Sequence, residues 1–286
     1  MSAAGEDPNA LRAQMLERWD AAATGWGRRA STLREDAMAV SAWMLEQLAL
    51  QAGQEVLELA AGPGDTGFLA AELVGPNGTL ICSDASEAML ALARDRAQAQ
   101  GIENVQFRLL ELEWIDLPAA SVDAVLCRWG VMLSVDPAAA LRECRRVLRP
   151  GGRVALAVWD APARNPWATL PTRAVVELGL TSPPDPNAPG MFALADADRL
   201  YELLGDAGFL EVVIASIEFQ RAPADVDAYL GETLDLSRAF FDLWSGLSDQ
   251  QRAEVRSKLA QLAKPFAARG GALRLPGSTL VAAASA

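Results

Sequence analysis

The feature that most constrains this sequence is a short apolar run that leads into a glycine-rich turn and then a helical pattern. The run spans residues 56–59, and the turn carries Gly62, Gly64 and Gly67. Glycine allows a positive φ and lets the backbone approach a ligand without a Cβ, while free N–H groups at a helix start favour anionic ligand groups. The pattern therefore predicts a strand, a cofactor-binding turn and a helix.

A second strand-like run, residues 79–84, ends at Asp84. A carboxylate there can accept hydrogen bonds from both hydroxyls of a ribose, so the cofactor is expected to contain a nucleoside. The glycine spacing followed by Asp84 also fits the dinucleotide fingerprint of nicotinamide enzymes. Glu58, however, lies just ahead of the glycines, where its charge would repel a pyrophosphate and suit a ligand with an ammonium group, such as S-adenosylmethionine.

Three motifs follow one another along the chain, at residues 56–64, 83–90 and 145–152. With these motifs the chain resembles the class I S-adenosylmethionine-dependent methyltransferases, and more closely the branch that includes the ubiquinone and menaquinone C-methyltransferases, over roughly residues 50–160. The resemblance implies S-adenosylmethionine as the cofactor and a small molecule as the methyl acceptor.

The resemblance also implies where the cofactor lies. The backbone of the glycine turn cradles the methionine part, Asp84 and its neighbour hold the ribose, and the adenine lies beside residues 111–113. Two positions depart from the family, because Ala60 stands where glycine is common and Glu111 where an aspartate is usual. The implied cofactor set is Glu58, Ala60, Gly62, Gly64, Asp84, Ala85, Met89, Glu111, Leu112 and Glu113.

Arg128 directly follows the apolar run 122–127. A charged side chain at such a place must find a partner, because Arg is rarely buried unpaired. That partner is a substrate carboxylate or phenolate, the carboxylate of the cofactor, or an internal acid. We assign Arg128 to the cofactor-binding set and keep the other two partners open.

Apolar strand patterns alternate with helical patterns through the middle of the chain. This alternation predicts an α/β fold, one Rossmann-like, doubly wound domain with a mostly parallel sheet. The resemblance implies seven strands with an antiparallel last strand. Strands are expected near residues 55–59, 79–84, 104–109, 122–128, 153–159, 211–219 and 278–284, and helices near 9–24, 36–50, 65–73, 86–100, 137–148 and 196–207.

We divide this domain into three parts. Residues 1–50 are expected to form an N-terminal helical lid, residues 51–160 the cofactor-binding core, and residues 161–286 the remainder of the same domain. The remainder holds two elaborations, at about 161–190 and 221–276, and the second reads as a helical insertion before the last strand. Long elaborations of a compact fold are often lids or binding elements, so both are expected to cap the substrate.

Ligands of open α/β sheets bind beyond the carboxyl ends of the strands, so residues after the fourth and fifth strands should face the transferable methyl group. Tryptophans are frequent there and in the N-terminal segment, which favours a small aromatic or hydrophobic acceptor. Core packing is the alternative, and it is preferred for Trp43 and Trp114. The residues expected to contact the acceptor are Trp19, Trp26, Trp129, Met132, Trp159, Asn165, Trp167 and Tyr229.

Composition excludes several chemistries. The chain has no histidine, which rules out imidazole bases and histidine-ligated metals, and its cysteine spacing offers no zinc site, so no metal is expected. With 25 basic and 37 acidic residues the net charge is -12, so nucleic acid is not expected as a partner. A basic cluster within residues 142–153 reads best as a solvated helix face.

The three cysteines, Cys82, Cys127 and Cys144, suit reduced thiols. Two of them, Cys82 and Cys127, fall in expected core strands, which favours buried thiols over a cysteine relay for arsenic methylation. The chain begins without a signal pattern and has no apolar run long enough to span a bilayer, so we expect a cytoplasmic protein with no membrane partner. The sequence leaves the oligomeric state open.

The sequence predicts an S-adenosylmethionine-dependent methyltransferase that aligns its acceptor for direct displacement, with O-, N- or C-methylation open. Alignment can supply about 7–11 kcal/mol, so lack of histidine is no obstacle. A base, if one is used, must be an acidic side chain, Tyr201 or Tyr229. The alternatives are a quinone-precursor C-methyltransferase, a non-catalytic S-adenosylmethionine-binding protein and a nicotinamide-dependent reductase.

Overall fold

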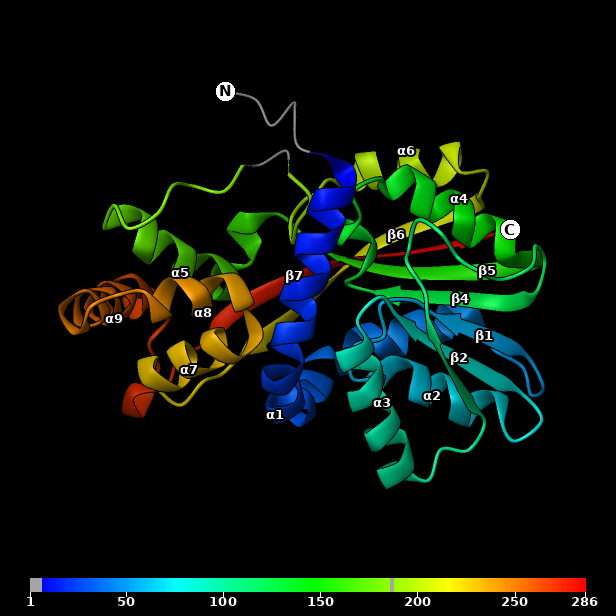
Figure 1. Ribbon diagram of the computed structural model, residues 1–286, viewed down its shortest axis with the longest axis horizontal. Coiled ribbons are helices and arrows are strands. Elements are labelled where there is room, and N and C mark those ends of the chain that lie inside the picture. The colour runs from blue at the N-terminus through cyan, green and yellow to red at the C-terminus, as the bar shows by residue number, and fades with distance from the viewer. Residues whose placement is uncertain (1–6, 186–187) are drawn as a thin grey trace.

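The computed structural model describes residues 7–185 and 188–286. In this part of the chain the strands form one seven-stranded sheet in the order β3-β2-β1-β4-β5-β7-β6 (Figure 1). Neighbours from β3 to β5 pair in parallel, whereas β7 pairs antiparallel with both β5 and β6. The predicted doubly wound fold with an antiparallel last strand is confirmed. The strands are β1 Glu55–Glu58, β2 Thr79–Asp84, β3 Val105–Leu109, β4 Val122–Arg128, β5 Leu148–Trp159, β6 Leu210–Arg221 and β7 Leu275–Ser285.

Helices cover both faces of the sheet, and successive strand residues face opposite sides. Val56 of β1 packs on the face that carries α2, α3 and the C-terminal end of the N-terminal helix α1 (Pro8–Leu48). Leu57 packs on the other face, against α4 and α6. Because both faces are covered, the central strands are almost continuously apolar. The helices that flank the sheet with α1 are α2 Asp65–Val74, α3 Glu87–Gln100, α4 Pro137–Val147 and α6 Ala197–Asp206.

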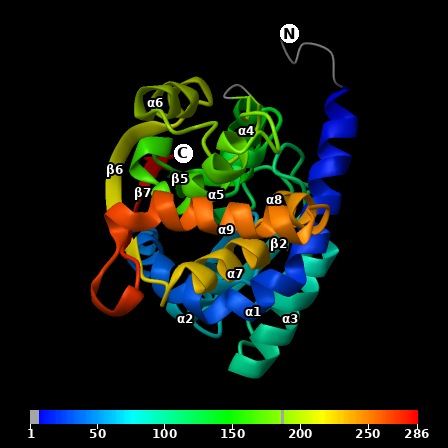
Figure 2. The ribbon, with the colours of Figure 1, turned by 90° about the vertical axis from the view of Figure 1, so that its left-hand side faces the viewer.

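The N-terminal helix α1 is one helix of 41 residues. The expectation of two separate helices, at 9–24 and 36–50, is wrong, because the stretch between them is helical too. Figures 1 and 2 show that α1 changes direction along its length. Its middle part contains Gly25 and Gly27, and glycines are common where helices bend. Among the described residues, neither α1 nor any other helix is long and apolar enough to cross a membrane.

Four helices, α5, α7, α8 and α9, gather at one side of the sheet, at the left of Figure 1 and in front in Figure 2. We call them the helical lobe. They share a core that includes Tyr229, Phe240 and Leu259. Helix α5 follows β5, and the other three lie between β6 and β7, so the helical insertion expected before the last strand is confirmed. The lobe helices are α5 Pro166–Glu177, α7 Val226–Leu236, α8 Arg238–Ser245 and α9 Asp249–Ala263, and the short 3-10 helices are η1 Val131–Leu133, η2 Pro162–Arg164, η3 Lys264–Phe266 and η4 Arg269–Gly271.

The two tryptophans expected in the core differ in position. Trp43 on α1 is half-buried and packs against the core on the face of the sheet that carries α2 and α3. Trp114 is 78% exposed, so the expectation of core packing is wrong for this residue. Its backbone N–H donates to the carbonyl of Glu111 at 3.3 Å, which closes a tight turn after β3 and leaves the indole outside.

Helix α1 touches the helical lobe directly at Gly25. A Cβ at this position would lie 2.0 Å from the carbonyl oxygen of Asp235 in α7. Arg28 and Arg29 form ion pairs with the Asp235 carboxylate at 2.5 and 2.7 Å. The indole N–H of Trp26 donates to the carbonyl oxygen of Leu236 at 3.2 Å. This hydrogen bond links α1 to α7 across 210 positions of sequence.

Replacement of Gly25 by alanine is expected to destabilise the protein by about 1–3 kcal/mol, because the new methyl group overpacks a backbone contact. The matched control is Gly205→Ala in α6, where a Cβ would meet nothing within 4 Å. This control should be neutral or stabilising by up to about 1 kcal/mol, as alanine is the better helix former. Urea unfolding of both variants measures the difference, and equal stability of Gly25→Ala and wild type would refute the close contact.

Candidate cofactor and acceptor site

The glycine turn and Asp84 meet at the carboxyl edge of the sheet because β1 lies between β2 and β4. Glu58 pairs in register with Cys82 of β2 and Leu126 of β4. Beyond this pairing, the N–H of Gly62 donates to Oδ2 of Asp84 at 2.9 Å. The strand ends that the sequence singled out therefore form one continuous edge.

Two residues at this edge have left-handed backbone although neither is glycine. Ala60 after β1 has φ 49°, and Trp129 after β4 has φ 59°. This conformation costs an L-residue roughly 1–2 kcal/mol, which explains why glycine is common at the position of Ala60. Gly130 makes room for the alanine methyl, since a Cβ at Gly130 would lie 2.5 Å from the Cβ of Ala60. Strained residues of this kind cluster at ligand-binding sites.

Glu58 is buried beneath the turn. Its Oε1 accepts a hydrogen bond of 2.8 Å from the N–H of Gly67, at the start of α2. A Cβ at Gly67 would lie 2.1 Å from Oε2, so glycine is required there. Oε2 itself is buried and has no hydrogen-bond partner among the described residues. Burial raises the pKa of Glu58 from 4.5 to about 8, opposed by the Gly67 hydrogen bond and the charge of Arg128.

Arg128 ends β4 on the same edge. Its guanidinium lies 4.5 Å from the ring centroid of Trp129, and its Nη1 is buried without a partner in the described part of the chain. Burial lowers the pKa of Arg128, while the charges of Asp65 and Glu58 raise it. Buried polar groups are rarely left unpaired, yet Glu58 and Arg128 each keep a polar side-chain atom at this edge that no described residue satisfies.

Asp84 and the first part of α1 form the next section of the site. The Asp84 carboxylate accepts hydrogen bonds from the N–H groups of Gly62 and Ser86, both at 2.9 Å, and burial raises its pKa. Ser86 donates through its hydroxyl to the carboxylate of Asp20 on α1. The half-buried Ala85 lies between these groups, and Met89 is buried against the Trp19 and Trp26 rings of α1. Helix α1 thus packs over the strand end that carries Asp84.

The three residues expected beside the adenine differ in environment. Glu111 is exposed, and Leu112 is half-buried against the core. The Glu113 carboxylate accepts a hydrogen bond from the N–H of Asp136 at 2.7 Å and pairs with Arg12 of α1. Glu113 therefore links α1 to the sheet edge and has no free charge to offer.

Aromatic side chains from separate segments form a cluster beside Arg128. Trp129 stacks on Trp159 with ring centroids 4.1 Å apart, and Trp167 meets Trp159 edge-on at 4.9 Å. Phe219 lies 5.8 Å from Trp159, and the Arg221 guanidinium lies 4.9 Å from the Trp167 ring. Trp129, Trp159 and Trp167 were expected near the acceptor and are brought together. Sequence reasoning missed Phe219 and Arg221, whose position at the end of an expected strand was the available signal.

The other residues expected near the acceptor have different neighbours. Trp19 and Trp26 form a separate pair on α1, 5.4 Å apart. Met132, in η1, is buried in the core. The Asn165 amide donates to the Ser278 carbonyl at 3.0 Å and accepts from the Ser278 N–H at 2.9 Å. Tyr229 is buried, and its hydroxyl donates to the Trp167 carbonyl at 2.5 Å. Asn165 and Tyr229 hold the cluster through bonds within the protein.

The chain is similar in sequence to known methyltransferases. Residues 50–177 match a family model described as a methyltransferase domain. Over 190 residues the chain is 34% identical to an arsenite methyltransferase of Halobacterium salinarum, with 65% of this chain and 46% of that protein covered. Over 119 residues it is 33% identical to a ubiquinone/menaquinone biosynthesis C-methyltransferase of Cellvibrio japonicus, with 41% and 48% covered. The chain therefore spans about half the length of the curated relatives it matches.

The fold is shared with a solved methyltransferase structure. A crystal structure of a Bacillus halodurans protein described as a methyltransferase aligns with a TM-score of 0.56 at 20% identity. The alignment covers 86% of this chain and 97% of that one. The match of residues 50–177 to the methyltransferase domain model confirms the resemblance drawn from the three motifs.

The raised pKa of Glu58 gives a pH dependence of stability. Between about pH 5 and 8 the folded protein retains a proton on Glu58 that the unfolded chain has released, so this group makes stability fall as pH rises through that window. Glu58→Gln removes the titration and should flatten the curve of unfolding free energy against pH there. Glu72→Gln, exposed on α2, is the control and should keep the wild-type slope. Parallel curves for Glu58→Gln and wild type would contradict the assignment.

Proposed function

We propose that the protein transfers a methyl group from S-adenosylmethionine to a small aromatic or hydrophobic acceptor, since residues 50–177 match a methyltransferase domain model. The observation that carries the proposal is a pair of buried side-chain atoms beside the glycine turn, Glu58 Oε2 and Arg128 Nη1, which have no hydrogen-bond partner in the described part of the chain. The amino-acid end of S-adenosylmethionine has an ammonium and a carboxylate, so it supplies the partner that each of these groups lacks.

The site residues fit the remaining parts of the cofactor. Asp84 has carboxylate lone pairs beyond those used by Gly62 and Ser86, which suits ribose hydroxyls. Ala60, Gly62 and Gly64 keep the backbone open for the methionine part. Met89 and Leu112, with exposed Glu111, are proposed to flank the adenosine. When bound, the cofactor supplies a methyl group on a positively charged sulfur, which is an intrinsically reactive donor.

The aromatic cluster is proposed to bind and orient the acceptor. Trp129, Trp159 and Trp167 form a rigid wall next to the strand end that carries Arg128. Flat apolar walls exclude water and hold a planar acceptor in one orientation, and such alignment can supply about 7–11 kcal/mol of the barrier. Arg128 lies at one end of the cluster, and Arg221 at the other end is already paired with Asp36 and Glu232.

The environment of the available acids and phenols supports catalysis without a strong base. Tyr229 is buried, and desolvation raises the pKa of its phenol, so it stays protonated and does not serve as a base. Burial alone would raise the pKa of Asp160, but hydrogen bonds from Ser278, Ala161 and Ser216 lower it below its ordinary value. Tyr201 on α6 is 56% exposed on the opposite side of the sheet from α1. An already acidic nucleophile, such as a phenol, therefore suits this site.

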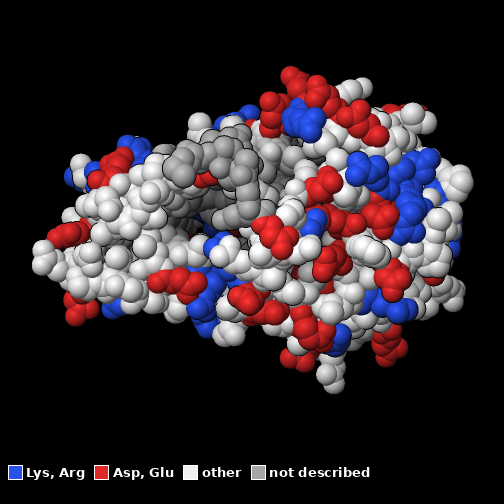
Figure 3. Space-filling view, turned by 45° about the horizontal axis from the view of Figure 1, so that its top comes forward, with Lys and Arg blue, Asp and Glu red and all other residues white. Residues whose placement is uncertain are grey.

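Helix α1 and the helical lobe are proposed to act as covers, with the described part of residues 1–50 over the cofactor and the described parts of the elaborations at about 161–190 and 221–276 over the acceptor; residues 1–6 and 186–187 lie outside the described residues. Contacts from Asp20 to Ser86 and from Arg12 to Glu113 support the first part, and the position of α5 and α7 around Trp167 supports the second. The net charge of -12 supports a small molecule over nucleic acid, and Figure 3 shows acidic side chains spread among the basic ones on one face of the molecule. Unpaired cysteines suit a reducing compartment, which supports the cytoplasm.

Two relatives suggest other acceptors. Quinone-precursor C-methylation is the second candidate, favoured by the similarity to the Cellvibrio japonicus enzyme. Arsenite is less suited, because Cys82, Cys127 and Cys144 are all buried. Burial raises the pKa of each thiol, to about 12 for Cys127, so thiolates are not presented to a ligand. A non-catalytic sensor would bind the cofactor without consuming it, and turnover of S-adenosylmethionine separates that case from an enzyme.

Calorimetry with S-adenosylhomocysteine tests the cofactor assignment. Wild type should bind in the micromolar range and show no measurable binding of NADH. Asp84→Ala should weaken binding about 100-fold, because each lost hydrogen bond to a charged group is worth roughly 1.5–3 kcal/mol. Asp198→Ala, exposed on α6, is the control and should bind like wild type. Tight NADH binding without S-adenosylhomocysteine binding would overturn the proposal.

Arg128→Met tests which part of the cofactor this residue holds. The variant should bind S-adenosylhomocysteine about tenfold or more weakly, since a charged hydrogen bond to the carboxylate is lost. Its affinity for 5′-methylthioadenosine, which lacks the amino-acid end, should stay within about twofold of wild type. An equal loss for both ligands would instead indicate a general disturbance of the site.

The acceptor class is tested by thermal unfolding of the complex with S-adenosylhomocysteine. Hydrophobic phenols at 100 times their Kd should raise stability by about 2.7 kcal/mol. Trp167→Ala should remove this stabilisation while the affinity for S-adenosylhomocysteine is kept. If no phenol or amine in a chemically varied set stabilises the complex, the proposed acceptor class is wrong.

A further inference from the structure

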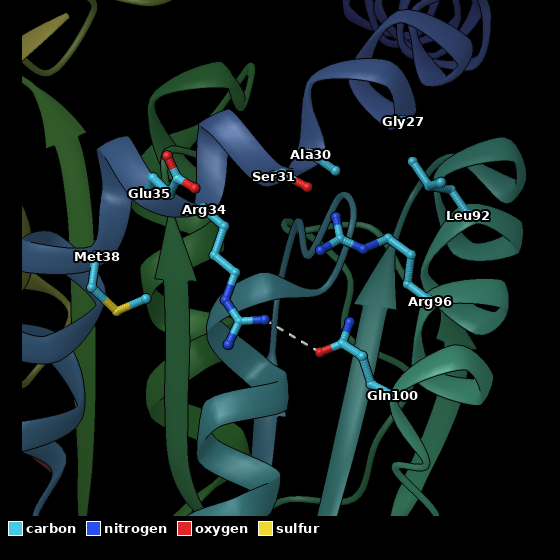
Figure 4. A pocket seen from close by; sticks show the side chains of 9 residues that line it. All are labelled: Gly27, Ala30, Ser31, Arg34, Glu35, Met38, Leu92, Arg96 and Gln100. Carbon is cyan, nitrogen blue, oxygen red and sulfur yellow. Dashed lines mark hydrogen bonds between the residues drawn. The ribbon is translucent and has the colours of Figure 1, made fainter.

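A pocket of about 590 Å³ lies between α1 and α3, apart from the glycine turn and the aromatic cluster (Figure 4). Its size falls within the range typical of small-molecule sites. None of its residues belongs to the sets assigned above to the cofactor or the acceptor. It is lined by Gly27, Ala30, Ser31, Arg34, Glu35, Met38, Leu92, Arg96 and Gln100.

Two arginines give the pocket a cationic side. Arg34 makes a 3.4 Å hydrogen bond to Gln100, and it forms no ion pair with any described carboxylate. Arg96 donates through Nη2 to Oδ1 of Asp65 at 2.5 Å, while its Nη1 is buried and has no partner in the described residues. Figure 4 shows both guanidinium groups between the two helices, with the Glu35 carboxylate on the other side of α1 from Arg34. One anion in the pocket would therefore meet two cations with unused donors.

Part of the remaining lining is apolar, and the rest is polar. Ala30 and Met38 come from α1, and Leu92 comes from α3. Gly27 lets α1 approach α3 closely, because a Cβ there would lie 3.2 Å from Cδ1 of Leu92. Apolar walls beside a cationic pair match a ligand with a carboxylate at one end and a short hydrocarbon part at the other. The planar guanidinium fork suits a carboxylate, which it can bind through two parallel hydrogen bonds.

We propose that this pocket binds a small organic carboxylate with a short apolar tail, held by Arg34 and Arg96 and covered by the middle part of α1. The ligand is separate from the methyl donor and from the acceptor. Arg96 also joins the pocket to the first residue of α2, Asp65, so the ligand lies one ion pair away from the glycine turn.

Octanoate is the probe, and its binding is measured by calorimetry on the full chain with and without saturating S-adenosylhomocysteine. We expect saturable octanoate binding in both conditions. Octanol, which lacks the charge, and inorganic phosphate, which lacks the tail, should each bind at least about tenfold more weakly. Displacement of octanoate by S-adenosylhomocysteine, or equal binding of octanoate and octanol, would overturn the proposal, and so would phosphate binding as tightly as octanoate.

Two variants locate the site. Arg34→Gln should weaken octanoate binding about tenfold or more, because it removes a charged partner near the surface. Arg199→Gln on α6 is the matched control and should bind octanoate like wild type. Ser31→Trp places an indole in the pocket and should abolish binding, with circular dichroism used to check that the variant is folded. Octanoate binding that survives in both Arg34→Gln and Ser31→Trp would place it elsewhere and reject the proposal.

Discussion

The structure depends on one buried carboxylate, that of Glu58 at the end of β1. It holds the first turn of α2 through the Gly67 N–H, and its other oxygen fills the space in which a Cβ at position 67 would lie. This contact fixes the path of the chain from strand to helix, and therefore the position of the glycines between them. Its Oε2 has no hydrogen-bond partner among the described residues. This unsatisfied oxygen supports the cofactor site that we propose at the end of β1.

Much of the core could be predicted because local patterns there agree with the fold. The apolar runs, the glycine turn and Asp84 identified β1, β2 and the sheet type. What escaped prediction depends on tertiary contacts. Trp114 is a large apolar residue of the kind that usually packs in a core, yet a tight turn after β3 leaves its side chain exposed. The left-handed backbone of Trp129 follows from neighbouring strand ends, which a linear pattern does not contain. The pairing of Asn165 with Ser278 likewise joins segments 113 positions apart.

Helix α1 contacts both halves of the molecule through polar groups. In its first part, Asp20 accepts a hydrogen bond from Ser86, and Arg12 pairs with Glu113. In its middle part, Arg28 pairs with Asp235 of the helical lobe. Further along, Asp36 pairs with the buried Arg221, which also pairs with Glu232 of α7 and lies over Trp167. One helix thus contacts residues next to the proposed cofactor site and also Arg221, which packs on the aromatic cluster. A displacement of α1 would change both environments together.

The place of β7 in the sheet has a consequence for how the chain folds on the ribosome. β6 ends at Arg221 and β7 begins at Leu275, yet β7 lies between β5 and β6 in the sheet. At roughly 5–20 residues per second, β6 and the lobe helices α7 to α9 emerge seconds before the strand that joins them to the rest. During that interval β6 has no hydrogen-bonded neighbour, because in the folded sheet it pairs with β7 and not with β5. The nascent chain must therefore pass through a stage with an open sheet edge, when chaperone binding would protect it most.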